Sequence, residues 1–453
     1  MSEQNETICA ISTPAGVGGI AVVRISGPQA ISIADSIWQG KRLTDAATHS
    51  VHYGTILDKH GNVVDDCVAT VFRAPKSFTG EDVVELSVHG SVYVQKTTVT
   101  LLNDAGARLA ERGEFTRRAF ANGKMDLAQA EGVADLIASR SRAAHDIAIR
   151  QMKGGFSQRL AAMHDNLLQL ASLLELELDF SEEDVEFASR SKLYGQAVAL
   201  RDEIVRLAAS FDNGNAIKEG IPVAIIGPTN VGKSSLLNAL VGDDRAIVSD
   251  IHGTTRDLIE DTIAIGDFSF RFIDTAGIRD TSDTIERLGI DRSLQAISRA
   301  TILLQVIDAA APQSMQLETN LTDNQHLIAV INKTDMASSE IAKTLIGNTE
   351  TIVEVSAKTL DGIDNLRATL IDIAQSLLGN TGDIIVTNAR HRQALLNALP
   401  PIERVIDGLK TNLSGDFIAQ DLREVLHHLG TITGTVTTSD ILTTIFSRFC
   451  IGK

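Results

Sequence analysis

The sequence predicts a multidomain protein with an α+β N-terminal domain, an all-α helical domain and an inserted α/β domain of the P-loop type. Short β-rich runs separated by turns fill residues 1–122, interrupted by one helical stretch at 92–105. Helical periodicity runs from 127 to about 210 and returns at 388–449. Between these helical parts lie a strand, a glycine-rich loop and a helix. Patterns of this kind predict separate α+β, all-α and α/β units.

The changes in pattern also predict the domain boundaries. The N-terminal domain is expected at 1–122, the two parts of the helical domain at 123–216 and 381–453, and the inserted domain at 217–380. Domain termini commonly lie close together, so a helical bundle tolerates an insertion. Three domains that simply follow one another are the alternative that the sequence leaves open.

Composition and charge limit the class of protein. The chain has 453 residues, of which 43% are hydrophobic, and a formal net charge of −17, which argues against nucleic-acid binding through bulk charge. Three cysteines far apart, Cys9, Cys67 and Cys450, indicate a reducing compartment without a disulfide framework. There is no signal-peptide pattern and no apolar run of about 18 residues, so we expect a cytoplasmic protein without a membrane span.

A phosphate-binding loop opens the inserted domain. Gly227–Ser234 read G-x-x-x-x-G-K-S, after the apolar run 221–226 and before a helical pattern. Backbone N–H groups of such a loop and the N-terminus of the helix favour a polyphosphate. Lys233 is expected to contact the β- and γ-phosphates, and Ser234 to bind Mg²⁺. An ordinary glycine-rich turn is the alternative interpretation.

Three later motifs indicate which nucleotide the domain binds. Asn332-Lys333-Thr334-Asp335 follows an apolar run, and an aspartate there can accept two hydrogen bonds that guanine donates and adenine cannot. Ser356-Ala357-Lys358 follows another strand and would close over the base. Asp274-Thr275-Ala276-Gly277 would supply a carboxylate near Mg²⁺ and an N–H for the γ-phosphate. Four motifs in this order predict a P-loop GTPase domain rather than an ATPase.

Motifs outside this domain point to one family. They are Thr7-Ile8-Cys9-Ala10, Thr13-Pro14-Ala15-Gly16-Val17-Gly18-Gly19-Ile20, Arg24-Ile25-Ser26-Gly27, Thr79-Gly80-Glu81-Asp82-Val83-Val84-Glu85-Leu86, His89-Gly90, Gly113-Glu114-Phe115-Thr116-Arg117-Arg118-Ala119-Phe120, Lys124-Met125-Asp126-Leu127-Ala128-Gln129-Ala130-Glu131 and Phe449-Cys450-Ile451-Gly452-Lys453. With them the chain resembles the MnmE (TrmE) family of tRNA-modification GTPases over its whole length. It departs from the family pattern at Ser91, where a second glycine is expected, and at Pro228-Thr229, where Arg-Pro is more usual.

The resemblance implies a specific activity and partners. Members form homodimers through their N-terminal domains, which bind a one-carbon folate such as 5-formyltetrahydrofolate. They are potassium-activated GTPases that act with the flavoprotein MnmG (GidA), in a heterotetramer or larger complex. Together they install an aminomethyl or carboxymethylaminomethyl group at carbon 5 of the tRNA wobble uridine. A GTP-driven switch module for ribosome or RNA assembly is the alternative.

The cation sites combine pattern and resemblance. Thr255, between the first helix and the next strand, is the candidate Mg²⁺ ligand of switch I. The resemblance implies a K⁺ ion held by Asn230 with backbone carbonyls around Ser249, Ile251 and Thr254. A monovalent cation there would neutralise charge that develops in phosphoryl transfer. A turn residue in the left-handed region is the alternative role of Asn230.

The expected GTP contacts form one set. They are Asn230, Val231, Gly232, Lys233, Ser234, Ser235, Ser249, Asp250, Ile251, His252, Gly253, Thr254, Thr255, Asp274, Thr275, Ala276, Gly277, Asn332, Lys333, Asp335, Ser356, Ala357 and Lys358.

The expected catalytic residues are Glu286, Lys233 and Thr255. Ile278 follows the Asp274–Gly277 motif at the position where small GTPases carry the glutamine that orients water, and isoleucine cannot do so. The resemblance assigns that task to Glu286, acting through a bridging water. Asp283 and Glu286 also fit a helix capping box, which is the alternative.

The folate site rests on the resemblance, which implies Arg24, Glu85, Lys124 and Lys453 as its residues. A cation and a carboxylate suit the glutamate tail and the pterin of a folate. Surface charges at a strand edge or a helix start are the alternative for all four. Cys450 is the candidate for a chemical role, against a cysteine buried at a helix end.

Overall fold

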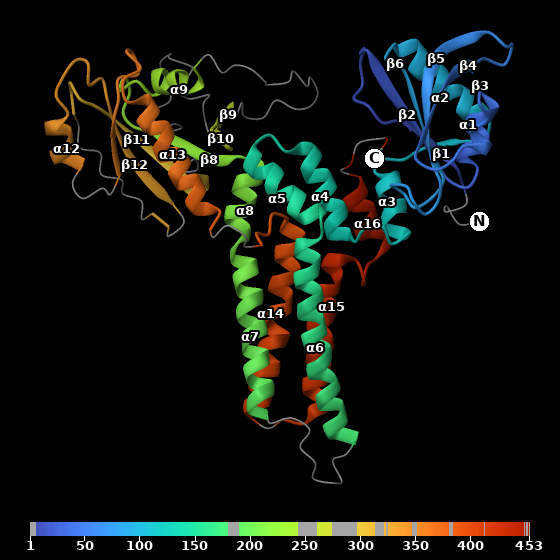
Figure 1. The fold of residues 1–453 in the computed structure, drawn as a ribbon. Coiled ribbons are helices and arrows are strands. Elements are labelled where there is room, and N and C mark those ends of the chain that lie inside the picture. The colour runs from blue at the N-terminus through green and yellow to red at the C-terminus, as the bar shows by residue number, and fades with distance from the viewer. Residues whose placement is uncertain are drawn as a thin grey trace. The chain divides into compact units, whose positions relative to one another are not determined.

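The computed structural model describes residues 6–179, 190–242, 261–273, 297–312, 321–322, 325–346, 351–379, 384–411, 413–447, 449 and 452 (Figure 1). The chain divides into two compact units. The first unit comprises Met1–Ile137, Ile149–Tyr194 and Arg404–Lys453, and the second unit comprises Ala138–Ala148 and Gly195–Glu403. The two units therefore alternate along the sequence: the first unit is made of three segments, and the two segments of the second unit lie between them.

The first unit begins with a seven-stranded sheet of order β3-β4-β5-β6-β2-β1-β7. The strands are β1 (Ile8–Ile11), β2 (Ile20–Ser26), β3 (Trp38–Gly40), β4 (Ser50–Leu57), β5 (Val63–Phe72), β6 (Val83–His89) and β7 (Arg108–Leu109). Neighbouring strands pair antiparallel, except that β1 and β7 pair parallel to each other. The β-rich runs expected from the sequence are confirmed, whereas β3 and β7, with three and two residues, are too short for a periodic signal.

One face of this sheet is buried under α1 (Ala30–Ser36) and α2 (Val92–Asp104). Because side chains alternate along a strand, Val23 and Leu86 enter this core while their neighbours Arg24 and Glu85 lie on the opposite face. The open face therefore carries two of the four candidate folate residues, Arg24 and Glu85.

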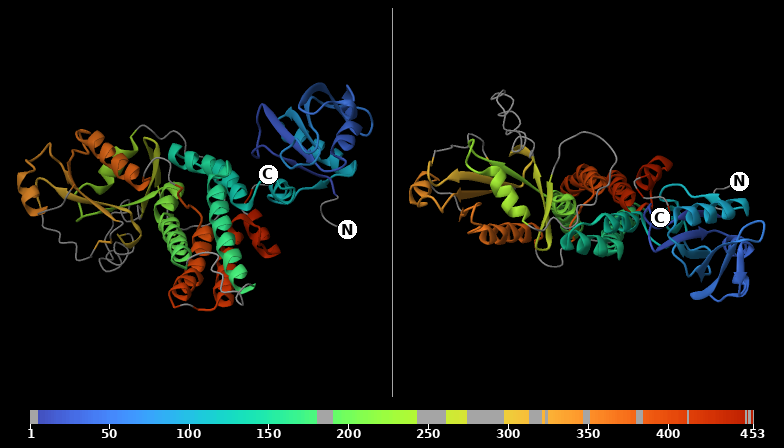
Figure 2. Two further views of the ribbon diagram at one scale, coloured as in Figure 1. Left: turned by 60° about the horizontal axis from the view of Figure 1, so that its bottom comes forward. Right: turned by 90° about the horizontal axis from the view of Figure 1, so that it is seen from above.

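The helices of the first unit include α3 (Glu114–Ala121), α4 (Leu127–Ala138), α6 (Gly155–Asp179), α15 (Gly415–Thr433) and α16 (Ser439–Phe446). α6 and α15 pack side by side (Figure 2). α16 contributes Ile445 and Phe446 to a core that also holds Leu127 and Phe449. The chain around Leu127 and the chain around Phe446, far apart in the sequence, thus share one hydrophobic cluster.

α5 (Arg142–Met152), α7 (Arg190–Ala209) and α14 (Ala389–Lys410) each span a boundary between the two units. The sequence pattern predicts separate helical stretches at 394–399 and 402–409, but the structure has one continuous helix, α14, with Pro400 and Pro401 inside it. Proline removes backbone hydrogen bonds from a helix interior, so the continuity of α14 across this pair needs stabilisation from packing. Buried Leu395, Ile402 and Ile406 on both sides of the prolines show that packing outweighs this loss.

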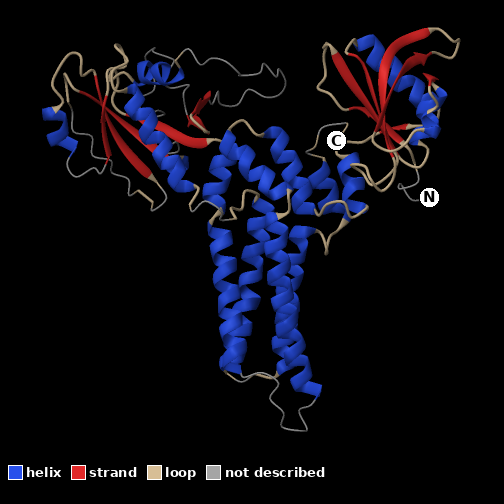
Figure 3. Cartoon of the chain, viewed as in Figure 1, coloured by secondary structure: helices blue, strands red, loops and turns tan. Residues whose placement is uncertain are grey.

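The second unit contains a six-stranded sheet of order β13-β12-β11-β8-β10-β9 (Figure 3). The strands are β8 (Ile221–Ile226), β9 (Asp261–Ile265), β10 (Phe268–Ile273), β11 (Ile302–Asp308), β12 (His326–Asn332) and β13 (Thr351–Glu354). Only β9 pairs antiparallel with its neighbour. All six residues of β8 are buried, as expected for a central strand covered on both faces.

Helices α8 (Phe211–Glu219), α9 (Lys233–Val241), α12 (Glu340–Ile346) and α13 (Ile363–Leu377) accompany this sheet. Leu236 of α9 and Leu370 of α13 pack in the main core of the unit with Val223 of β8. Among the described residues, no helix combines the length and apolar character needed to cross a membrane.

Candidate functional site

The phosphate loop joins β8 to α9, as the motif predicts. Gly227 has φ 151°, and a Cβ there would lie 2.5 Å from the carbonyl oxygen of Val306. Gly232 has φ 97° at the N-cap of α9, and a Cβ there would collide with the side-chain amide of Asn332. Both positions therefore require glycine. Asn230 adopts φ 66°, which agrees with its interpretation as a left-handed turn residue.

Lys233 lies over this loop. Its ammonium donates hydrogen bonds to the carbonyl oxygens of Gly227 and Pro228, each at 2.7 Å. Burial lowers the pKa of Lys233, because a desolvated ammonium is disfavoured. Phosphate oxygens at the N-terminus of α9 would supply the opposite charge that this buried cation favours. Ser234 and Ser235 follow in the first turn of α9.

Asn332 connects the base-recognition loops to the phosphate loop. Its side-chain amide donates to the carbonyl oxygen of Val231 at 2.9 Å, and its side-chain oxygen accepts the backbone N–H of Ala357 at 3.0 Å. The Ser356 hydroxyl donates to an oxygen of Asp335 at 2.8 Å and thereby orients the carboxylate expected to bind guanine. The structure thus brings three of the four predicted motifs together at the carboxyl ends of parallel strands, where such sheets bind ligands.

Sequence reasoning missed Asp308, at the end of β11. The ammonium of Lys333, which has φ 65°, contacts Asp308 at 2.6 Å and the carbonyl oxygen of Asn230 at 2.8 Å. Burial opposes ionisation of Asp308, but the hydrogen bonds from Lys333 and from the N–H of Ala310 outweigh it, so the pKa of Asp308 is lowered. A charged residue at the last position of an otherwise apolar strand was the available signal.

Lys358, next to Ala357, is described, whereas the remaining predicted nucleotide residues lie outside the described part of the chain. They are Ser249, Asp250, Ile251, His252, Gly253, Thr254, Thr255, Asp274, Thr275, Ala276, Gly277 and Glu286.

In the first unit, Arg24 and Glu85 face each other across β2 and β6. The guanidinium contacts one carboxylate oxygen of Glu85 through Nε and Nη2, both at 2.8 Å. It also lies 5.5 Å from the ring of Phe78 and 5.6 Å from that of Phe115. Glu85 is therefore a paired group on an interior strand of the sheet, not a surface charge on an edge.

Lys124 takes a different partner. Its ammonium donates to the carbonyl oxygen of Pro75 at 3.0 Å, and its aliphatic stem runs beside Gly80. Lys124 thus contacts the loop that carries Phe78. Lys453 and Cys450 lie outside the described residues.

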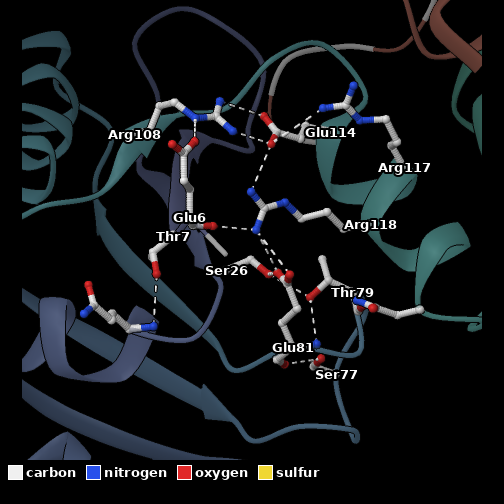
Figure 4. A network of polar contacts seen from close by, with 12 residues as sticks. Glu6, Thr7, Ser26, Ser77, Thr79, Glu81, Arg108, Glu114, Arg117 and Arg118 are labelled. Atoms are coloured by element: carbon white, nitrogen blue, oxygen red, sulfur yellow. Dashed lines mark hydrogen bonds and ion pairs between the residues drawn. The ribbon is translucent and has the colours of Figure 1, made fainter. Parts of the chain in front are cut away.

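A buried ionic network supports this site and was not foreseen as a unit (Figure 4). Glu114 is 1% exposed and accepts hydrogen bonds from Arg108 at 2.7 Å and from Arg118 at 3.0 Å. Arg118 also reaches Glu81 at 3.2 Å, and Glu81 accepts the hydroxyl of Ser26 at 2.7 Å. The network therefore connects the N-terminal turn of α3, which also carries Phe115, to the end of β2.

Glu114→Gln is expected to lower the free energy of unfolding by roughly 3 kcal/mol, because it removes the buried carboxylate that pairs with both Arg108 and Arg118. Burial raises the pKa of Glu114, but Arg108, the N–H of Glu111 and Arg118 outweigh it and lower the pKa to about 2. The contribution of Glu114 to the free energy of unfolding is fully present above the pKa of the unfolded state, near 4.5, and is lost as the pH falls toward 2. Urea unfolding of the wild type and of Glu114→Gln between pH 2 and pH 4.5 measures this contribution. Glu111→Gln is the control, because the side chain of Glu111 is exposed. A difference in stability that stays constant down to the lower pH would contradict the assignment.

Two family models match the chain. The model described as "GTP-binding protein TrmE N-terminus" matches residues 7–124, and the "MnmE helical domain" matches residues 127–450.

Curated relatives agree over the full length. The tRNA modification GTPase MnmE of Parabacteroides distasonis is 51% identical over 99% of this chain and 100% of the relative. The same-named proteins of Christiangramia forsetii and Bacteroides fragilis are 46% and 48% identical, each over 99% of both chains. A solved structure, the G domain of the T. maritima FeoB iron transporter, matches 34% of this chain and 99% of its own at 23% identity, with a TM-score of 0.26 that is too low to support a conclusion. The chain, with its phosphate loop and guanine-type base motif, belongs to the MnmE family of tRNA modification GTPases.

Proposed function

We propose that this chain is a potassium-activated GTPase that, with a flavoprotein partner of the MnmG type, installs an aminomethyl or carboxymethylaminomethyl group at carbon 5 of the tRNA wobble uridine. A one-carbon folate such as 5-formyltetrahydrofolate supplies the carbon. Membership of the family over the full length supports the proposal. The observation that carries the folate part is the half-buried Arg24–Glu85 pair, flanked by two aromatic rings.

The chemistry of that pair suits a folate. A guanidinium binds the carboxylates of a glutamate tail, and a carboxylate accepts hydrogen bonds from the amino group and ring N–H of a pterin. The rings of Phe78 and Phe115 offer apolar surface beside both groups. We include Lys124 and Lys453 in the same proposed site, on the basis of the family resemblance.

In the second unit we propose GTP with Mg²⁺ and K⁺. Lys233 and the N-terminus of α9 would hold the phosphates, with Ser234 and Thr255 as the Mg²⁺ ligands. Asn230 and the carbonyls around Ser249, Ile251 and Thr254 would hold K⁺. We also propose that the N-terminal domain spans 1–122, the two parts of the helical domain span 123–216 and 381–453, and the inserted GTPase domain spans 217–380.

We propose a homodimer through the open face of the seven-stranded sheet. Ile20 on β2 and Val51 and Tyr53 on β4 lie on this face and are 70%, 64% and 72% exposed, and burying such apolar side chains would favour association. Val51 belongs to the same cross-strand row as Thr70, Glu85 and Arg24. A second copy would cover this apolar surface and enclose the proposed folate site. Sedimentation of Tyr53→Asp, expected to be monomeric, tests this part.

The decisive test is mass spectrometry of wobble uridines in cells that lack this chain. Loss of the modified nucleoside, restored by the wild-type gene, supports the proposal. Normal wobble uridines together with association of the chain with ribosomal subunits would favour the alternative, a switch for ribosome or RNA assembly.

Arg24→Ala is expected to weaken binding of 5-formyltetrahydrofolate by roughly 10- to 100-fold, because it removes a charged hydrogen-bond donor. Titration calorimetry on the full chain measures this affinity. GTP hydrolysis should be unchanged, since Arg24 belongs to the other unit. Arg42→Ala is the matched control, because its side chain is 72% exposed in the same unit. Equal affinities for the wild type and Arg24→Ala would remove Arg24 from the site.

A further inference from the structure

The loop between β5 and β6, residues 73–82, brings an aromatic ring to Arg24. Phe78 in this loop is 37% exposed, and its ring centroid lies 5.5 Å from the guanidinium carbon of Arg24. The ring of Phe115 lies 5.6 Å from the same carbon, but Phe115 is fully buried on α3. A helix and a core therefore fix Phe115, whereas the position of Phe78 depends on what holds the loop. We call residues 73–82 the Phe78 loop.

One anchor of the Phe78 loop is the carboxylate of Glu81 (Figure 4). Both of its oxygens accept hydrogen bonds from Nη1 of Arg118 at 3.2 Å, and one of them also accepts the hydroxyl of Ser26 at 2.7 Å. The side chains of Glu81 and Arg118 are only 14% and 6% exposed. Hydrogen bonds between charged groups are stronger than those between neutral groups, so this pair ties the loop firmly to α3.

A second anchor is Thr79, the residue next to Phe78. Thr79 is fully buried, and its hydroxyl shares a hydrogen bond with that of Ser26 at 2.7 Å. Its carbonyl oxygen accepts the side-chain amide of Asn122 at 2.8 Å. Asn122 is the C-cap residue of α3. The helix that carries Phe115 thus also holds the loop that carries Phe78.

We propose that Glu81 and Arg118 are positioning residues of the folate site, which act through Phe78. Together with Asn122 they fix the loop, so that the ring of Phe78 stands beside Arg24 before the ligand arrives. A loop that is already ordered loses little conformational entropy when a ligand binds, and the affinity is higher for that reason. The inference rests on the proposed function and adds to it residues that shape the site from outside.

Glu81→Ala in the full-length protein tests the first anchor. The loop then loses the side-chain bonds to Arg118 and Ser26, so hydrogen–deuterium exchange of the peptide 73–82 should become roughly 10-fold faster. The affinity for 5-formyltetrahydrofolate, measured by titration calorimetry, should fall by roughly 10-fold. Glu81 is the residue to change, because Arg118 also pairs with buried Glu114. Glu111→Ala is the control, since the side chain of Glu111 is 63% exposed.

Asn122→Ala tests the second anchor and serves where loss of the Glu81 carboxylate prevents folding. Asn122 is exposed, and the substitution removes its hydrogen bond to the carbonyl oxygen of Thr79. Loop exchange should become several-fold faster and folate binding weaker, with the melting temperature nearly unchanged. Asn103→Ala is the matched control, because Asn103 is an exposed asparagine near the C-terminus of α2. Exchange at the wild-type rate in both Glu81→Ala and Asn122→Ala would overturn the anchors.

A double-mutant cycle with Phe78→Ala separates positioning from general stability. Phe78→Ala alone should weaken folate binding by a factor similar to that of Glu81→Ala. If Glu81 acts through Phe78, Glu81→Ala should cause little further loss of affinity in the Phe78→Ala protein. Additive losses would overturn the positioning role, and so would faster loop exchange with unchanged folate affinity.

The test also keeps the two proposals apart. If the wild type itself fails to bind 5-formyltetrahydrofolate, the proposed function fails. The exchange rates of Glu81→Ala, Asn122→Ala and their controls still decide whether α3 holds the Phe78 loop.

Discussion

Glu286→Ala is expected to reduce the rate of GTP hydrolysis by roughly 100-fold or more, if this carboxylate orients the attacking water. GTP affinity should change little, because the residue would act on the nucleophile and not on the bound nucleotide. Single-turnover hydrolysis in potassium, with nucleotide binding measured separately, tests both statements. Glu286 lies outside the described residues, so this expectation rests on Ile278 and on the family resemblance.

Glu286→Gln separates this role from the capping-box alternative. Glutamine still closes a capping box but carries no negative charge. A Gln variant that hydrolyses GTP at the wild-type rate would return Glu286 to a structural role. In that case Glu286→Ala should cost about 1 kcal/mol of helix stability and leave the rate nearly intact.

Asp335→Asn is expected to weaken GTP binding by roughly 100- to 1000-fold and to favour xanthosine triphosphate instead. The carboxylate would accept two hydrogen bonds from guanine, and hydrogen bonds to charged groups each contribute about 1.5–3 kcal/mol. An amide can donate to the 2-oxo group of xanthine, which inverts the preference. Competition between the two nucleotides, measured by fluorescence titration, gives the ratio.

Ser356→Ala is the control variant for Asp335→Asn. The Ser356 hydroxyl contacts Asp335 at 2.8 Å and only orients it, so Ser356→Ala should weaken GTP binding by less than about 10-fold without creating a preference for xanthine. If Asp335→Asn binds GTP as tightly as the wild type, the carboxylate does not recognise the base.

The sequence alone identified the nucleotide chemistry, because each motif there is local. A strand, a loop with glycines and a helix are sufficient to place Lys233 and Ser234, and the backbone that binds phosphate is built within eight residues. The motifs that carry Asp335 and Ser356 could be assigned to one site for a similar reason: each motif lies at the end of a parallel strand, and the ends of such strands lie together.

Only the tertiary structure decided which distant side chains meet. Arg24 and Glu85 are 61 residues apart in the sequence, and their contact depends on the register in which β2 pairs with β6. If that register slipped by one residue, every side chain of the shifted strand would move to the other face of the sheet. The contact between Ser12 and Gly452 spans 440 residues and needs a buried backbone carbonyl at a left-handed glycine. The periodicity of apolar residues in the sequence does not predict contacts between such distant residues. Strand register and close backbone approach depend on the packing of the whole unit rather than on neighbouring residues.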